Sequence, residues 1–347
     1  MAVELSVVVA TYQRRALLQR LLGQLAQQTF SAFEVVVVDD GSSEPVAPSL
    51  DLHDFPFPLY VLTQRNSGAA AARHRGILEA SGALLVIVDD DMQVGPDFLQ
   101  RHLDAHPPGS RRVVLGRISA DPRVAHMPLF ERWYAFRLDS VARQVEAGTQ
   151  RLEGSALYTG NVSMRRADYL AVGGFDPLLE RSEDAELGLR LEAAGVEFAF
   201  AALAVTLHGS DHTSEATWLT RAFAYGVFDS RIRTRHPTTL QADPWRLLFK
   251  LRAPVRPLLA AVVLAPNATR PVSRALLAAT HLVDALGLAR VAYAGSAVAY
   301  SMEYFRGVRD EAGSLWASVD ALAHHVGLRR QWRRSAQGRA HVPAPAR

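Results

Sequence analysis

Two continuous apolar runs, each followed at once by acids, constrain this chain more than any other feature. Residues 35–38 lead into Asp39-Asp40-Gly41-Ser42, and residues 84–88 lead into Asp89-Asp90-Asp91. A continuous Val, Ile and Leu run is typical of a parallel strand that is covered on both faces. In open α/β sheets ligands bind beyond the carboxyl ends of such strands, so we expect these acids to line a ligand crevice. Because five carboxylates in one crevice repel one another, we expect a divalent metal and a phosphorylated ligand there.

Strand and helix patterns alternate along the first hundred residues, which is typical of right-handed βαβ units. We expect strands at 5–10, 34–38, 59–63 and 83–88 and helices at 15–27 and 69–80. Farther along we expect strands at 112–118, 196–201 and 204–207 and helices at 128–146 and 185–194. Beyond residue 214 the strands stop, and helical segments broken by proline follow. The sequence therefore predicts an α/β fold, with a Rossmann-like, mostly parallel sheet flanked by helices and a helical C-terminal extension.

Composition and charge exclude several classes of protein. The chain has 347 residues and no cysteine, which excludes a disulfide scaffold, a thiolate metal site and a cysteine nucleophile. Residues 251–347 carry a net charge of +8, whereas the first 250 residues carry −5. The first nine residues have the pattern of a strand and not that of a signal peptide, so we expect a cytoplasmic protein.

Further polar motifs lie at expected strand ends and helix starts. Asn66-Ser67-Gly68 opens the second helix, where glycine permits close backbone approach, the N-terminus favours an anion, and Arg73 follows. Glu183-Asp184 precedes another expected helix, and His208 follows an apolar run. Taken alone, each motif also has an ordinary structural interpretation as a turn, a cap, a complement to the helix dipole or a satisfied histidine.

The order of these motifs is more specific than any one of them. It runs from Thr11 through Asp39-Asp40-Gly41-Ser42, Asn66-x-Gly68-(x)4-Arg73, Asp89-x-Asp91, Gly160-Asn161, Gly174-Phe175-Asp176 and Glu183-Asp184 to His208. In this order the chain resembles the family 2 glycosyltransferases, which have the GT-A fold. The resemblance covers about residues 3–212.

The resemblance implies a binding site for a nucleoside-diphosphate sugar, with UDP-sugars favoured. Asp89 would contact the ribose or the donor sugar, and Gly160-Asn161 would line the donor and acceptor crevice. The residues expected at the nucleotide are Thr11, Asp40 and Arg73, and further donor-binding candidates are Asp39, Asn66, Gly68, Asp90, Asn161 and Glu183.

The resemblance also implies the chemistry. Asp91 would hold Mg²⁺ or Mn²⁺ with His208 as a second ligand, although His212 leaves open which histidine lies nearer the metal. The ion would neutralise the departing pyrophosphate. Asp184 would remove the proton of an acceptor hydroxyl in a single displacement that inverts the anomeric centre. The expected activity is hexosyl transfer to a glycan, a lipid-linked acceptor or a small molecule.

We expect a glycosyltransferase domain at 1–215, with a nucleotide-sugar-binding half at 1–102 and an acceptor half at 103–215. A helical region at 216–334 and a disordered tail at 335–347 would follow. The apolar segments 258–265 and 291–302 are too short to span a membrane. The cations and the ring of Arg329-Arg330-Gln331-Trp332-Arg333-Arg334 fit peripheral contact with the inner face of a cell membrane, a solvated tail or a dimerisation surface. We expect no nucleic-acid partner.

Three other functions are alternatives. A haloacid dehalogenase phosphatase needs Thr or Val where this chain has Gln93, and a lysine farther along, whereas Lys250 is the only lysine. A sugar-nucleotide pyrophosphorylase needs a Gly-rich loop with Arg and Lys, which Thr11-Tyr12-Gln13-Arg14 does not provide. A non-catalytic nucleotide-sugar-binding or membrane-associated scaffold protein would show no turnover, so a turnover assay separates it from an enzyme.

Overall fold

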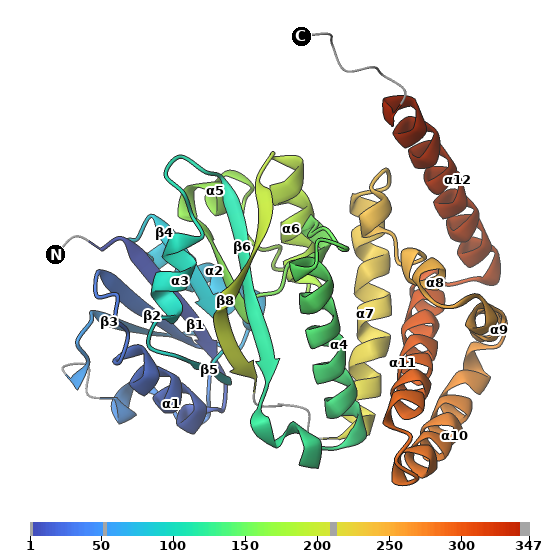
Figure 1. Cartoon of the computed structure of the whole chain (residues 1–347), viewed down its shortest axis with the longest axis horizontal. Helices are drawn as coiled ribbons and strands as arrows, with labels where there is room; N and C mark the ends of the chain where they lie inside the picture. The colour runs from blue at the N-terminus through green and yellow to red at the C-terminus, as the bar shows by residue number, and fades with distance from the viewer. Residues whose placement is uncertain (1–2, 51–53, 209–213, 341–347) are drawn as a thin grey trace. The chain divides into compact units, whose positions relative to one another are not determined.

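The structure, a computed structural model, describes residues 3–50, 54–208 and 214–340. The chain forms two compact units, residues 1–212 and 213–347, where we expected a boundary after residue 215. The first unit contains the sheet, and the second unit is helical (Figure 1).

The first unit is built on an eight-stranded sheet with helices on both faces (Figure 1). Its strands are β1 (Leu5–Thr11), β2 (Phe33–Asp39), β3 (Leu59–Thr63), β4 (Leu84–Val88), β5 (Met92–Val94), β6 (Arg112–Ala120), β7 (Asn161–Arg165) and β8 (Glu197–His208). In space they follow the order β3-β2-β1-β4-β7-β6-β8-β5, and β5 and β7 are antiparallel to their neighbours. The predicted mixed, mostly parallel sheet is confirmed.

Six helices accompany the sheet in the described part of the first unit. They are α1 (Arg15–Leu25), α2 (Ala69–Glu79), α3 (Phe98–Asp104), α4 (Leu129–Glu146), α5 (Arg166–Ala171) and α6 (Glu183–Ala193). Short 3₁₀ turns lie at η1 (Ala47–Ser49), η3 (Pro122–His126) and η4 (Gly154–Ala156).

Burial on both faces explains the continuous apolar runs. On β1, Val7 and Val9 belong to one core, which includes Leu18 of α1, whereas Val8 belongs to a second core with Ile77 of α2. All seven residues of β2 are buried. Alternate side chains therefore pack against helices on opposite faces, as expected for central strands of a doubly covered sheet.

Two features of the sheet differ from expectation. The strands expected at 196–201 and 204–207 form one strand, β8, because the pairing of β6 with β8 shifts register between Gly116 and Arg117 and both strands continue past the bulge. No pattern in the sequence predicts β5 or β7. These strands have three and five residues of mixed polarity, which is too short for a clear periodicity.

The strand ends bring the acid motifs to one edge of the sheet. Thr11 pairs with Asp39 at the ends of β1 and β2. Since β4 and β6 are each antiparallel to β7, and β6 is parallel to β8, these strands run in the direction of β1. Asp89 directly follows β4, and β8 ends at His208. The carboxyl ends of all these strands thus share one edge, where ligands bind in such sheets.

The second unit consists of helices around a separate apolar core. They are α7 (Glu215–Arg235), α8 (Arg246–Lys250), α9 (Arg256–Leu264), α10 (Pro266–Ala285), α11 (Ala289–Glu311) and α12 (Leu315–Ala340), with 3₁₀ turns at η5 (Leu240–Ala242) and η6 (Ala253–Val255). A Cβ at Gly226 of α7 would collide with the carbonyl oxygen of Tyr304, so glycine permits the close approach of α7 and α11. Helix α12 extends to Ala340, into the segment for which we expected disorder, and residues 341–347 lie outside the described ranges. None of the helices within those ranges is long and apolar enough to cross a bilayer.

Candidate functional site

Arg73 connects the acids that follow β4 to those that open α6. Its guanidinium donates from Nη2 to Asp89 Oδ1 at 2.5 Å and from Nη1 to Glu183 Oε1 at 3.3 Å. Arg73 itself lies on α2 and is 8% exposed. Burial lowers the pKa of Arg73, but Asp89 and Glu183 outweigh this and raise the pKa above its ordinary value. The guanidinium is therefore a fixed positive charge between the two carboxylates.

Glu183 and Asp184 lie next to each other in the first turn of α6. Burial, and after it the negative charge of Glu183, raise the pKa of Asp184 to about 8, although the N–H of Ala185 and the charge of Arg73 oppose the rise. Burial also raises the pKa of Glu183, and Arg73 opposes this rise. A carboxyl whose pKa lies near neutrality in a charged site is equipped to act as a general base.

Arg14 provides a second cation beside the acids that follow β4. Its Nη1 lies 3.1 Å from both Asp90 Oδ1 and Asp91 Oδ2. Thr11 donates its hydroxyl to Asp90 Oδ2 at 2.7 Å. Burial raises the pKa of Asp90, whereas Thr11 and Arg14 lower it. The motifs named in the sequence analysis do not include Arg14. Its position in the loop that follows β1, at the acid-lined edge of the sheet, is the feature that could have indicated it.

The short strand β5 brings Asp91 and His208 together. It begins directly after Asp91, and its first residue, Met92, pairs with His208. His208 Nε2 lies 3.8 Å from Asp91 Oδ2. A carboxylate oxygen and an imidazole nitrogen form a donor pair that suits a divalent cation such as Mn²⁺. Among the residues that the structure describes, no three Asp, Glu or His side chains gather as a ready metal site, and His212 lies outside them.

Asp39 and Asp40 hold the loops that follow β2 and β3. Asp39 is fully buried and accepts two bonds of 3.0 Å, from the N–H groups of Ser42 and Val46. Asp40 is 4% exposed and accepts bonds of 2.8 to 2.9 Å from Gln64, Ser67 and Gly68. The backbone of Gly68 has φ +89°, and Asn66 is exposed in the same loop. The two acids shape the loop at the start of α2, and each carboxylate keeps further accepting capacity.

The structure places the Asn161 side chain inside the protein and not in the crevice, which corrects our expectation. Asn161 is fully buried, and its Oδ1 accepts from His102 Nε2 at 2.8 Å. Its Nδ2 donates to the carbonyl oxygens of Arg117 and Ala204 at 3.2 and 2.9 Å. The amide therefore connects β7 to β6 and β8. The neighbouring Gly160 does lie at the acid edge, because a Cβ there would be 3.2 Å from Asp89 Oδ2.

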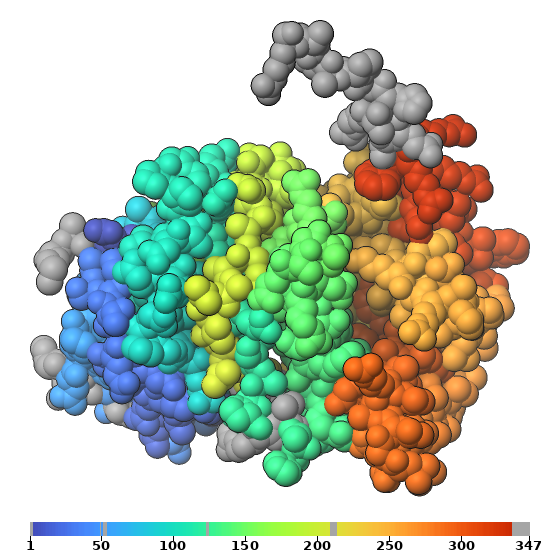
Figure 2. Space-filling model, viewed as in Figure 1, coloured from blue at the N-terminus to red at the C-terminus, as the bar shows by residue number. Residues whose placement is uncertain are grey.

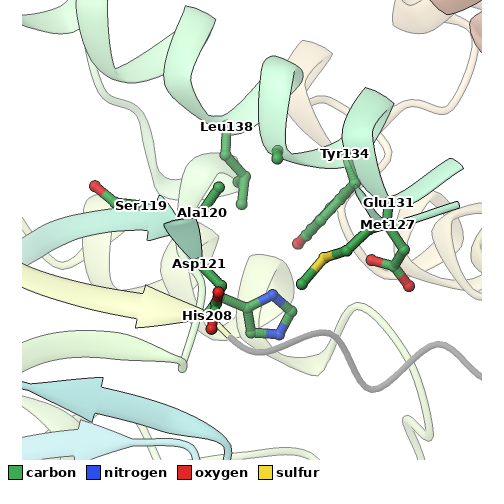
Figure 3. A pocket seen from close by; sticks show the side chains of 9 residues that line it. Ser119, Ala120, Asp121, Met127, Glu131, Tyr134, Leu138 and His208 are labelled. Carbon is green, nitrogen blue, oxygen red and sulfur yellow. The ribbon is translucent and has the colours of Figure 1, made fainter. Parts of the chain in front are cut away.

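A small hollow opens beside His208 (Figure 3). Tyr134 and Met127 point towards His208 across it, and the Tyr134 ring centroid lies 6.2 Å from that of His208. Two acids in its lining, Asp121 and Glu131, are each 4% exposed. No sequence motif marks these two acids. Asp121 directly follows β6, and Glu131 lies in the first turn of α4.

Comparison with known proteins shows the fold of this chain and the family that part of it resembles. Residues 6–168 match the family model described as Glycosyl transferase family 2. Just under half of the chain is thus similar to this family. Validoxylamine A glucosyltransferase of Streptomyces hygroscopicus subsp. jinggangensis is 35% identical over 219 residues, which cover 55% of this chain and 52% of the relative. An uncharacterized glycosyltransferase of Haemophilus influenzae is 29% identical over 196 residues, 54% of this chain and 61% of the relative.

This chain spans about half the length of the Streptomyces relative. Among solved structures, a mannosyltransferase of Pyrobaculum calidifontis in complex with GDP-Man and Mn²⁺ matches this chain with a TM-score of 0.57 at 18% identity. The match covers 87% of this chain and 86% of the mannosyltransferase. The predicted GT-A fold and the predicted resemblance to family 2 are thus confirmed.

Proposed function

We propose that this protein is an inverting glycosyltransferase that moves a sugar from a nucleoside-diphosphate sugar to an acceptor hydroxyl. The observation that carries the proposal is the double ion pair of Arg73 with Asp89 and Glu183. It ties the acids after β4 to the first turn of α6, so the donor-side carboxylates and Asp184 belong to one site. The family match supports this assignment.

The donor side is assigned to the loops at the carboxyl ends of β1, β2 and β4. We place the nucleotide at Thr11, Asp40 and Arg73, and the ribose or donor sugar at Asp89. The start of α2 supplies backbone N–H groups near this edge, which favour an anion. The remaining donor-side candidates are Asp39, Asn66, Gly68, Asp90 and Glu183.

We assign the binding of Mg²⁺ or Mn²⁺ to Asp91 and His208. Their facing oxygen and nitrogen atoms, 3.8 Å apart, fit a shared divalent ion, and phosphate oxygens of the donor complete such sites in other proteins. When bound, the ion supplies positive charge to the pyrophosphate leaving group. Arg14 Nη1 donates to the same oxygen, Asp91 Oδ2, at 3.1 Å and holds that carboxylate in place.

Asp184 is the proposed general base. Its raised pKa lets it take the proton of an acceptor hydroxyl as that oxygen attacks the anomeric carbon and the bond to the diphosphate breaks. One displacement of this kind inverts the anomeric configuration. Arg73 holds the adjacent Glu183, so the two acids have different partners and Asp184 is left to face the acceptor.

The acceptor is assigned to the side of His208, where the hollow lined by Tyr134 and Met127 lies. The name of the Streptomyces relative makes glucosyl nucleotides the first donors to test, with UDP-glucose before GDP-glucose. Glycan, lipid-linked and small-molecule acceptors are all included in the proposal. Peripheral contact of the basic C-terminal region with a membrane stays a prediction.

The test combines donor binding with turnover. We expect the full chain to bind UDP-glucose in the presence of Mn²⁺, to lose most of this binding in EDTA, and to release UDP when an acceptor is supplied. Asp184→Asn should bind the donor with near-parent affinity and transfer about 10²- to 10⁴-fold more slowly. Asp104→Asn, an exposed carboxyl on α3, is the matched control and should behave like the parent.

Three results would contradict parts of this proposal. Undiminished turnover in Asp184→Asn together with a loss in Glu183→Gln would move the role of base to Glu183. Undiminished turnover in both variants would refute the mechanism. Donor binding with no turnover of any acceptor would favour the non-catalytic alternative.

A further inference from the structure

Strand β5 forms one edge of the sheet and, within the part of the chain that the structure describes, pairs with β8 alone. The backbone N–H and C=O groups on the outer side of an edge strand need partners that are not strands. Asp91 directly precedes β5, and Met92 pairs with His208. The position of this short strand therefore decides how the two candidate cation ligands face each other.

Helix α1 packs against β5 and supplies such partners. Arg20 Nη2 donates to the carbonyl oxygen of Asp91 at 3.0 Å. One helical turn later, Gln24 Oε1 accepts the N–H of Val94 at 3.0 Å. Because residues four positions apart project from the same side of a helix, both side chains reach the same stretch of backbone. Their bonds hold β5 at its start and at its end.

The turn after α1 continues this contact along the backbone that follows β5. Gln28 Nε2 donates to the carbonyl oxygen of Gly95 at 2.7 Å, and its Oε1 accepts the N–H of Leu99 at 3.0 Å. Figure 1 shows α1 and β5 side by side, and in Figure 2 the blue surface of the N-terminal residues adjoins the blue-green surface of α3. Three polar side chains at intervals of four residues thus hold the outer side of β5 and the start of α3.

The other contacts of β5 fix its position less specifically. Its pairing with β8 extends over three residues only. Met92 and Val94 belong to the apolar core that includes Leu18, but apolar attraction is non-directional and does not by itself fix a strand along its own axis. A slip of one residue moves the backbone by about 3.3 Å and turns each side chain to the other face. This displacement is comparable to the 3.8 Å between Asp91 Oδ2 and His208 Nε2, so the register of β5 sets the geometry of the cation site.

We propose that Gln24 is a positioning residue for the candidate cation site. Its bond to Val94 holds β5 in register, and β5 in turn keeps Asp91 in front of His208. The inference rests on the proposed assignment of Mg²⁺ or Mn²⁺ to these two ligands. Arg20 acts on the same strand, but its guanidinium also places charge beside Asp91. Gln24 is neutral and acts through the backbone of β5, so it is the cleaner position to test.

The experiment measures two properties of the full chain: Mn²⁺ affinity with UDP, by paramagnetic resonance titration, and backbone hydrogen exchange at residues 92–95 without metal or nucleotide. Gln24→Met keeps the length of the side chain but removes the acceptor. Exchange should become faster, and Mn²⁺ should bind roughly 3- to 10-fold more weakly. Gln24→Glu retains an acceptor oxygen and should keep both properties near the parent values. Gln27→Met and Gln27→Glu make the same changes at an exposed position and should behave like the parent.

Thermal melting establishes that each variant folds. If Gln24→Met does not fold, Gln28→Met removes the bonds to Gly95 and Leu99 instead and should weaken Mn²⁺ binding in the same way. The inference is overturned if Gln24→Met exchanges or binds Mn²⁺ like the parent, or if Gln24→Glu binds it as weakly as Gln24→Met. A parent that binds no Mn²⁺ with UDP would refute the proposed cation site itself, and this inference with it.

Discussion

The raised pKa of Asp184 predicts how the transfer rate depends on pH. A base must be ionised to accept a proton, and a carboxyl with a pKa of about 8 is ionised to roughly one part in ten at pH 7. At pH 9 it is almost fully ionised. We therefore expect kcat/KM for the acceptor, which reports the enzyme before the acceptor binds, to rise roughly tenfold between pH 7 and pH 9.

A variant of the neighbouring acid tests the cause of this shift. The negative charge of Glu183 raises the pKa of Asp184, so Glu183→Gln should lower that pKa and move the profile to lower pH. A displacement of about one unit corresponds to about 1.4 kcal/mol of repulsion, a modest value for adjacent carboxylates. Glu180→Gln changes an exposed acid three residues earlier and should leave the profile in place.

The assay is initial-rate measurement of nucleoside diphosphate release over pH 6 to 9 at saturating donor and metal. A flat profile over this range would refute the assignment of a raised pKa to the base. A profile that rises but stays in place in Glu183→Gln would show that burial alone, without the neighbouring charge, sets the pKa.

The same protonation has a consequence for stability. Because the folded-state pKa of Asp184 lies above the ordinary value, the native state holds a proton that the unfolded chain has already lost between about pH 4 and pH 8. Stability should therefore fall as the pH rises through this window. Urea unfolding of the parent and of Asp184→Asn at several pH values should show a smaller decline in the variant.

Two other predictions concern the cation site and the helical unit. Arg14→Gln removes the guanidinium that lies 3.1 Å from Asp90 and Asp91. Without nucleotide, this variant should bind Mn²⁺ several-fold more tightly than the parent in a paramagnetic resonance titration, whereas Arg15→Gln should bind it like the parent. Equal or weaker binding by Arg14→Gln contradicts the prediction. Gly226→Ala places a methyl group against the carbonyl oxygen of Tyr304 and should cost about 1–3 kcal/mol in urea unfolding. In the control Gly23→Ala, the added methyl group meets no atom within 4 Å, and the free energy of unfolding should rise by up to about 1 kcal/mol. Equal effects of the two substitutions on unfolding would show that α7 and α11 separate readily.

The central strands were predictable because their apolar runs report burial on both faces, which is a local property of the sequence. The position of Asp39 and Asp89 at one sheet edge followed from the same runs. The pairing of Met92 with His208, by contrast, joins residues more than a hundred positions apart, and nothing local announces it. The sequence therefore predicts that Asp91 belongs to the site but not which side chain it meets.

Side-chain roles were predictable only where one motif implies one chemistry. Asn161 stands beside Gly160 in a motif that we expected to line the crevice, yet its amide bonds His102 and two carbonyl oxygens inside the sheet. A buried asparagine and a ligand-binding asparagine look the same in a sequence. Arg14 was missed for the opposite reason, since its partners lie 76 and 77 residues away.

The structure also changes the argument for a metal. From the sequence, the mutual repulsion of the acids seemed to require a divalent ion. In the folded chain, Asp39 and Asp40 accept hydrogen bonds from backbone N–H groups. Arg73 pairs with Asp89, and Arg14 pairs with Asp90 and Asp91.

The acids alone therefore do not require a divalent ion, because fixed donors and two guanidinium groups already compensate them. A nucleoside diphosphate adds new negative charge beside Asp91, and this charge has no counterpart among the paired arginines. Affinity for Mg²⁺ or Mn²⁺ should accordingly depend on the donor and be weak without it. A metal affinity that is the same with and without nucleoside diphosphate would show that the protein ligands alone, and not the donor, attract the ion.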